Sequence, residues 1–337
     1  MSRIAVIGAG AWGTALAIVL GRRGGHAVRL WAYEQEVVAS ILARRTNDLF
    51  LPEASIPATV TVTDSLTDAL NGAEIVLSVM PSHHVRRLFT QMLPHLSDDM
   101  VFVSATKGVE DQTYLRMTEV IEEVVTPRFS PRLVAVSGPT FAKEVAKGDP
   151  TAITAASSDE DLARTVQHEF SDPRFRVYTN RDVVGVELGG ALKNVIAIAA
   201  GICDGLELGH NSVAALVTRG LAEITRLSLA CGGHIETMAG LAGLGDLVLT
   251  CTGGLSRNRT VGVELGKGRK LADIIAGMRG MVAEGVLTTN AAIGLANKHG
   301  VEMPITQQMH AILHQGKSPS DAIRELMSRP STTEVWL

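Results

Sequence analysis

The sequence has few cysteines. Cys203, Cys231 and Cys251 are the three in 337 residues, and neither their odd number nor their spacing fits a disulfide framework or a metal-binding pair. Each lies among small or apolar residues, as buried free thiols do. The pattern argues against a disulfide-stabilised scaffold and predicts a protein of a reducing compartment that holds no metal.

An excess of charge of one sign is also missing. Lys and Arg total 31 against 35 Asp and Glu, and the formal net charge is −4. Such a balance gives no long-range attraction to nucleic acid or to anionic lipid. We therefore expect small molecules or proteins as partners, and no nucleic acid.

One long uncharged run, from Ile4 to Gly21, superficially imitates a signal peptide or a membrane span. Three glycines, Gly8, Gly10 and Gly13, interrupt it at a fixed spacing directly after a β-branched segment. Neither a spanning helix nor a signal core would gain from these glycines. We expect no targeting segment and no transmembrane segment.

No Pro/Ser linker, internal repeat or low-complexity segment divides the chain, although its length favours two domains. Eight short β-rich runs alternate with helical patterns before Asn180, and this alternation predicts an α/β, doubly wound parallel sheet of the Rossmann type. After Val183 the pattern is helical, and near the end Ser318 and Pro319 can begin a helix. The sequence predicts a nucleotide-binding domain over 1–181 and a mainly helical substrate-binding and catalytic domain over 182–337.

The glycine pattern at the N-terminus is a complete G-x-G-x-x-G in IAVIGAGAWG. It follows a predicted strand and precedes a predicted helix, which is the context that dinucleotide binding requires. Gly8 permits the tight turn, Gly10 lets the backbone approach a pyrophosphate, and Gly13 packs the helix on the strand. The alternative is an ordinary tight turn between a strand and a helix.

The choice between NAD and NADP is normally read at the end of the second strand. Glu34 is the acidic residue nearest to that place and favours NAD. Arg44 and Arg45 could turn toward a 2'-phosphate, so both nucleotides stay open.

A long helix is predicted to begin near Val184, and it carries Lys193. Leu188, Leu192, Val195 and Ala199 would form its apolar stripe, with Lys193 off that stripe. The lysine has Gly189, Gly190 and Ala197 three or four residues away, and we expect these small residues to let a ligand approach. Desolvation in such a cleft would lower the pKa of Lys193 toward neutrality, as a proton donor needs. The alternative is a lysine whose stem lies along a domain edge.

The glycine-rich segment GLAGLGDL, followed by TCTGGLSRNRT, supplies the remaining polar groups. Asp246 could orient Lys193, or it could simply end a turn. Ser256, Arg257 and Asn258 are typical of a helix start, and the guanidinium of Arg257 could hold a phosphate in two places. The pair His83 and His84 has no spaced acidic partner for a metal and receives no catalytic role.

At this point the chain resembles the bacterial NAD(P)-dependent glycerol-3-phosphate dehydrogenase family over essentially its whole length. The motifs that carry the resemblance are GAGAWGTALA, SATKG, GPTFAKEVAKGDPTA, GGALKNVIAIAAGICDGL and GLAGLGDLVLTCTGGLSRNRTVG.

The resemblance implies NAD(P)H-dependent, reversible reduction of dihydroxyacetone phosphate to sn-glycerol 3-phosphate for phospholipid synthesis. It makes Lys193 the proton donor and acceptor, and it groups Asp246 and Lys107 with it as catalytic residues. The implied cofactor contacts are Gly8, Gly10, Ala11, Trp12, Gly13, Tyr33, Lys107, Ala142, Arg257, Val282 and Glu284. The implied substrate contacts are Lys107, Gly138, Thr140, Lys193, Asp246, Ser256, Arg257 and Asn258.

Three positions depart from the pattern of the family. Thr140 and Ala11 stand where serine is common, and Tyr33 stands where many relatives carry an arginine associated with a 2'-phosphate. The resemblance also implies a helical domain like the C-terminal domain of 6-phosphogluconate dehydrogenase and a cytoplasmic homodimer. The alternatives are a reductase of 2-keto or 3-hydroxy acids, with Arg257 holding a carboxylate, and a cofactor sensor without turnover.

Overall fold

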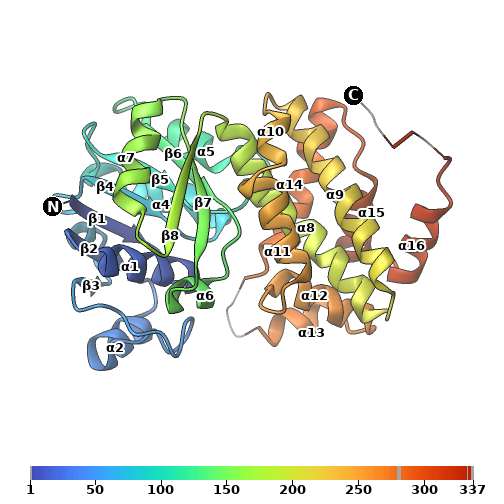
Figure 1. The fold of residues 1–337 in the computed structure, drawn as a ribbon, viewed down its shortest axis with the longest axis horizontal. Helices are drawn as coiled ribbons and strands as arrows, with labels where there is room; N and C mark the ends of the chain where they lie inside the picture. The colour runs from blue at the N-terminus through green and yellow to red at the C-terminus, as the bar shows by residue number, and fades with distance from the viewer. Residues whose placement is uncertain (1, 279–281, 332, 335–337) are drawn as a thin grey trace.

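The computed structural model describes residues 2–278, 282–331 and 333–334. In Figure 1 the first half of the chain forms a sheet with helices on both faces, and the second half forms a helical bundle beside it. The strands are β1 (Ser2–Ile7), β2 (His26–Trp31), β3 (Val60–Thr63), β4 (Ile75–Ser78), β5 (Val101–Ser104), β6 (Arg132–Ser137), β7 (Thr151–Ala156) and β8 (Phe175–Asn180). All eight β-rich runs of the sequence are therefore strands.

The eight strands form one sheet in the order β3-β2-β1-β4-β5-β6-β7-β8. The predicted doubly wound sheet is confirmed and is mostly parallel: every neighbouring pair is parallel except β6 and β7, which are antiparallel. Only α6 (Ala142–Lys147) connects these two strands. Its six residues span roughly 9 Å, whereas a six-residue strand spans roughly 20 Å, so the connection does not return the chain to the start of β6.

Helices cover both faces of the sheet because alternate residues of each strand point to opposite sides. Ile4 and Val6 of β1 belong to one buried cluster, with α1 (Ala11–Arg23) and α7 (Glu160–Phe170). Ala5 and Ile7 belong to another cluster, with α4 (Val85–Met92) and α5 (Met117–Val125). The remaining helices of this half are α2 (Gln35–Arg44), α3 (Leu66–Leu70), η1 (Ser82–His84) and η2 (Leu93–His95).

The helical half is built around α8 (Val183–Gly205), which is buried on all sides from Gly185 to Cys203. The other elements are α9 (His210–Ala230), α10 (Ile235–Met238), η3 (Leu241–Gly245), α11 (Asp246–Thr252), α12 (Arg257–Gly266), α13 (Leu271–Ala276), α14 (Glu284–His299), α15 (Pro304–Gln315) and α16 (Pro319–Met327). As expected, Ser318 caps α16 and Pro319 opens it. The predicted apolar stripe of Leu188, Leu192, Val195 and Ala199 is buried, but so is the rest of the helix, because it has neighbours on every side.

Two segments of this half, Val183–Gly205 and Ile235–Thr252, are long and apolar enough to span a membrane by length and composition. The first segment is α8, and 89% of its most apolar window is buried inside the protein. Its hydrophobicity is that of a core helix.

The two halves meet without a linker, since β8 ends at Asn180 and α8 begins at Val183. A small cluster of Ala135, Ala156, Val186 and Ala242 joins the sheet to the helices. The division at residues 181 and 182 stays our interpretation of this change from sheet to helix.

Candidate active site

The three glycines of the N-terminal motif have three different surroundings. Gly8 has a φ of +118°, and a Cβ there would lie 2.4 Å from the carbonyl oxygen of Val79. A Cβ on Gly13 would lie 1.9 Å from the carbonyl oxygen of Gly8, whereas a Cβ on Gly10 would have no atom within 4 Å. Gly8 therefore makes the turn, Gly13 lets the helix touch the strand, and Gly10 leaves open space at the carboxyl edge of the sheet.

The helix that follows begins with free backbone donors. Gly10 is the N-cap of α1 and has no side-chain cap, so the first N–H groups of the helix are directed outward without intrahelical partners. Asn47 and Thr14 both donate to the carbonyl oxygen of Ala9 and fix the turn. The indole Nε1 of Trp12 is buried and has no hydrogen-bond partner among the described residues. Such an N-terminus suits a pyrophosphate.

The ribose end of this site is marked by Tyr33 and Glu34. Tyr33 is 70% exposed, and Glu34 is the N-cap of α2. The guanidinium of Arg45 donates to the carbonyl oxygens of Ile56 (3.2 Å) and Val60 (2.8 Å). Arg44 pairs with Asp48 at the surface. Arg45 thus has a structural role, and only Arg44, in an exposed pair, is placed to reorient.

In a second group of polar side chains, Asp246 accepts hydrogen bonds from two lysines. Its Oδ1 accepts a hydrogen bond from Lys193 Nζ, and its Oδ2 accepts one from Lys107 Nζ at 2.7 Å. Lys107 also donates to the carbonyl oxygen of Gly138 (3.0 Å) and to Thr140 Oγ1 (3.2 Å). The structure thereby brings together five of the predicted residues from four separate segments. Of the two roles that the sequence left open for Asp246, this contact favours the orientation of Lys193.

Lys193 is buried, and its surroundings change its acidity. Burial lowers the pKa of Lys193 to about 7, and the nearby Lys107 ammonium lowers it further, while the Asp246 carboxylate opposes the shift. The expected shift of this pKa toward neutrality is confirmed. An amine with a pKa near the working pH can both give and take a proton.

The small residues beside Lys193 do not leave room for a ligand, contrary to our expectation. A Cβ on Gly189 would lie 2.6 Å from the carbonyl oxygen of Ala242, and one on Gly190 would lie 2.4 Å from Ser137 Oγ. These glycines let η3 and β6 pack directly against α8. Their function is to bring protein backbone close to the lysine.

Asp246 is held at the first residue of α11, directly after the π-helical turn η3. It is completely buried, so the reading of a turn aspartate at the end of a flexible loop was wrong. Ser256 caps α12, accepting a hydrogen bond from the Arg259 N–H at 3.2 Å. Asn258 is buried, donates to Asn194 Oδ1 at 2.9 Å, and accepts from the Gly285 N–H at 3.0 Å. Arg257, by contrast, is exposed.

The late predicted cofactor contacts lie at the start of α14. Glu284 accepts hydrogen bonds from the Ser82 N–H (3.2 Å) and from Ser82 Oγ (2.8 Å). Burial raises the pKa of Glu284, and the hydrogen bonds from Ser82 and the charge of Arg257 oppose this shift. Val282 lies just before α14, and Ala142 is the first residue of α6. Glu284 therefore connects the helical half to the loop after β4.

Sequence reasoning missed two polar groups of the site. Thr250 accepts a hydrogen bond from Lys193 at 2.8 Å, and its spacing of four residues from Asp246 on one helix could have revealed it. Asn194, the residue after Lys193, bonds to Asn258. Within the described ranges no group of three His, Cys, Asp or Glu side chains is arranged to hold a metal.

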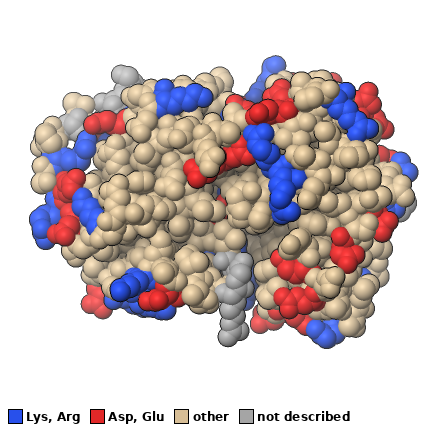
Figure 2. Space-filling model, turned by 180° about the vertical axis from the view of Figure 1, so that it is seen from behind, with Lys and Arg blue, Asp and Glu red and all other residues tan. Residues whose placement is uncertain are grey.

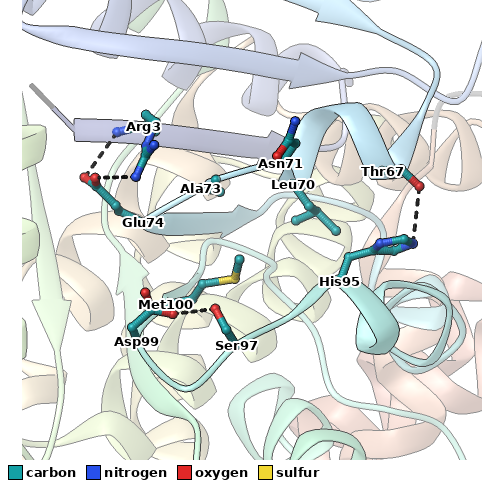
Figure 3. Close-up of a pocket in the computed structure, with 11 residues that line it drawn as sticks. Arg3, Thr67, Leu70, Asn71, Ala73, Glu74, His95, Ser97, Asp99 and Met100 are labelled. Carbon is teal, nitrogen blue, oxygen red and sulfur yellow. Dashed lines mark hydrogen bonds and ion pairs between the residues drawn. The ribbon is translucent and has the colours of Figure 1, made fainter.

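A hollow of about 360 Å³ lies elsewhere, near Arg3, Glu74 and His95 (Figure 3). Arg3 and Glu74 form an exposed ion pair across one side of it, and His95 bonds to Thr67 on the other. It lies at the amino ends of β1, β4 and β5. Ligands of open α/β sheets bind at the carboxyl ends, so this hollow is not the candidate active site.

The cluster of Lys107, Asp246 and Lys193 lies where the two halves meet. Figure 2 shows the two halves as lobes, with basic and acidic side chains next to each other along their junction. Neither sign dominates the face in view, in agreement with the balanced composition.

Comparison with known families gives a consistent match over both halves. A family model described as the NAD-dependent glycerol-3-phosphate dehydrogenase N-terminus matches residues 3–163. A second, described as the C-terminus of the same enzyme, matches residues 182–324.

Individual relatives are similar over their full length. The glycerol-3-phosphate dehydrogenase (NAD(P)+) of Acidobacterium capsulatum is 58% identical over 99% of this chain and 100% of its own length. That of Citrifermentans bemidjiense is 55% identical over 97% of both chains. A crystal structure of glycerol-3-phosphate dehydrogenase from Coxiella burnetii is 42% identical, covers 97% of this chain and 99% of its own, and superposes with a TM-score of 0.93.

Proposed function

Because this chain belongs to the NAD-dependent glycerol-3-phosphate dehydrogenase family, we propose that it reduces dihydroxyacetone phosphate to sn-glycerol 3-phosphate, reversibly and with NAD(P)H. The observation that carries the proposal is the buried Lys193, bonded to Asp246 at the junction of the two halves. The open space at Gly10 and the free N-terminus of α1 fit the nucleotide.

Reduction of a ketone needs a hydride at carbon and a proton at oxygen. When bound, NAD(P)H would supply the hydride to C2 of the substrate. Lys193 supplies the proton, so the carbonyl oxygen becomes a hydroxyl and the lysine becomes a neutral amine. In the reverse direction the neutral amine takes the proton from that hydroxyl, and a pKa of about 7 suits both directions.

Asp246 and Lys107 prepare Lys193 for this step. The carboxylate of Asp246 holds the Lys193 ammonium in place, since it is fully buried and bonded to both lysines. Burial lowers the pKa of Lys193, and the Lys107 ammonium lowers it further by like-charge repulsion. Lys107, with Gly138 and Thr140, also forms the side of the site on which substrate is expected.

The phosphate of the substrate is held, in this proposal, at the N-terminus of α12. Arg257 is an exposed residue there, and its guanidinium adds a two-pronged donor to the positive end of the helix. Ser256 and Asn258 shape this end through the capping bond and the bond to Asn194. Val282 and Glu284 stand on the nucleotide side of the same junction.

Three wider inferences accompany the activity. The product would supply glycerophospholipid synthesis, the protein would function in the cytoplasm, and it would form a homodimer. The resemblance of the chain to its family supports these inferences, and three buried or half-buried free cysteines agree with a reducing compartment.

The test is an initial-rate assay of the purified protein. Oxidation of NADH and of NADPH is measured with and without dihydroxyacetone phosphate, and with a 2-keto acid as control. Turnover with the triose phosphate alone supports the proposal, and the ratio of the two nucleotides gives the preference that Glu34 and Arg44 leave open. Turnover with the keto acid instead, or with neither, contradicts it.

A further inference from the structure

The loop that carries Lys107, residues 105–116, is attached to the helical half at several points. Val109 is buried in the core cluster of that half, and Tyr114 packs against the same cluster. All other members of the cluster come from Val184 or later. The loop thus connects elements of the sheet half, but its apolar side chains pack in the core of the helical half.

One of these contacts is between Tyr114 and Gly294 of α14. A Cβ on Gly294 would lie 2.2 Å from two ring carbons of Tyr114 and 2.7 Å from its hydroxyl oxygen. The ring therefore lies directly on the helix backbone, in a place that only glycine leaves free. Tyr114 has a φ of +60°, an uncommon conformation for a tyrosine, which the surrounding contacts must maintain.

The end of the loop is held by a buried carboxylate. Glu187 of α8 accepts hydrogen bonds from Arg116 Nη1 (2.6 Å) and from the Thr118 N–H (2.9 Å). Near Lys107, Gly108 packs on Ser82, the residue that bonds to Glu284. The end of the loop is therefore bonded to α8 through Arg116, and its start packs on Ser82, which bonds to Glu284 of α14. Lys107 directly precedes this second attachment.

We propose that Tyr114 is a positioning residue, which holds the loop 105–116 on the helical half so that the Lys107 ammonium stays against Asp246 beside Lys193. Lys107 comes from the sheet half and Asp246 from the helical half, so their 2.7 Å contact depends on how the loop packs on α14. The inference rests on the proposed function, because Lys107 matters here through its effect on Lys193.

The consequence is a pH effect. The charged groups that face Lys193 are Asp246 from α11 and Lys107 from the loop; burial raises the pKa of the neighbouring Cys251 thiol to about 12, so it stays neutral. Displacement of Lys107 removes a like charge and frees an oxygen of Asp246. Burial would still keep the pKa of Lys193 below its ordinary value, but without the Lys107 charge this pKa would rise above about 7.

The experiment compares Tyr114→Ala with Tyr114→Phe in the full-length protein. For Tyr114→Ala we expect kcat for dihydroxyacetone phosphate reduction to fall roughly tenfold to a hundredfold, as for a small misplacement of a catalytic group. The pH at which its activity falls should be higher than in the wild type. Tyr114→Phe should behave as the wild type. Tyr178→Ala, at an exposed tyrosine of β8, is the matched control.

A second variant, Gly294→Ala, displaces the ring without removing it, and alanine favours the helix. It should show the same pH shift, whereas Gly209→Ala, where no atom lies within 4 Å, should not. Wild-type kcat and pH dependence in both site variants would overturn the proposal. A lower kcat with an unshifted pH profile, or failure of both variants to fold, would show a structural role only and would overturn it too. Retained turnover in Lys193→Ala would instead contradict the proposed function.

Discussion

The turn after β1 and the surroundings of Lys193 are both rich in glycine, but the glycines serve opposite purposes. At Gly10 the absent side chain leaves open space. At Gly189 and Gly190 the space is filled by the backbone of η3 and by Ser137. One region is open to a nucleotide, and the other is packed so tightly that a lysine loses its water. The comparison teaches that glycine can favour ligand binding in one place and desolvation of a charged group in another.

The largest expected effect comes from removing the amine that this packing desolvates. Lys193→Ala should lower kcat for dihydroxyacetone phosphate reduction by about a hundredfold to ten-thousandfold, because a proton donor acts in the transition state. Steady-state assays at saturating substrate measure it, with NADH binding as a check on the fold. Lys298→Ala, at the exposed end of α14, is the control. Normal turnover in Lys193→Ala would remove the basis of the mechanism.

The next largest effect is expected on substrate binding, from the loss of the Arg257 side chain. Arg257→Ala should raise the KM for dihydroxyacetone phosphate roughly tenfold to a hundredfold, since a hydrogen bond to a charged group contributes about 1.5–3 kcal/mol. The pair of initial-rate constants, kcat and KM, separates binding from chemistry. Arg324→Ala on α16, another exposed arginine, should leave both unchanged. The assignment of Arg257 to the phosphate fails if its KM equals that of the wild type.

Two glycine substitutions compare open and filled space within one motif. Gly10→Ala should raise the Kd for NADH about tenfold, or 1.4 kcal/mol, without a loss of thermal stability, because the methyl group meets only the nucleotide. Gly13→Ala should destabilise the fold by about 1–3 kcal/mol or more, because its methyl would meet the carbonyl oxygen of Gly8. Calorimetry and fluorescence titration measure the two effects. If both variants lose the same stability and the same affinity for NADH, the distinction between open space at Gly10 and filled space at Gly13 is wrong.

The smallest effect separates capping from substrate binding. Ser256 and Ser318 each cap a helix. Their hydroxyl oxygens accept a hydrogen bond from the N–H of the third helical residue, at 3.2 and 3.1 Å respectively. Replacing either by alanine should cost about 1 kcal/mol of stability. Only Ser256→Ala should also raise the KM for dihydroxyacetone phosphate. If Ser256→Ala leaves this KM unchanged, Ser256 has no part in substrate binding.

The cofactor region could be predicted from the sequence because it is local. Strand, glycine turn and helix follow one another within residues 2–23, so spacing alone assigned a place to each glycine. The chemical region is assembled from segments that are 31 to 139 residues apart, as the contacts of Lys107 show. The sequence therefore offered a contact of Asp246 with Lys193 as one of two alternatives, and it did not predict what fills the space beside Gly190. Thr250 and the contact of Tyr114 with Gly294 likewise depend on packing between distant elements.

The central claim is that packing gives Lys193 the acidity of a proton donor, and the pH dependence of a single turnover tests it most directly. Reduction needs the protonated amine, so the rate constant at saturating NADH and dihydroxyacetone phosphate should fall as pH rises through about 7. Lys193→Ala should lack this dependence. A wild-type rate constant that stays level up to the ordinary lysine pKa of about 10.4 would contradict the account.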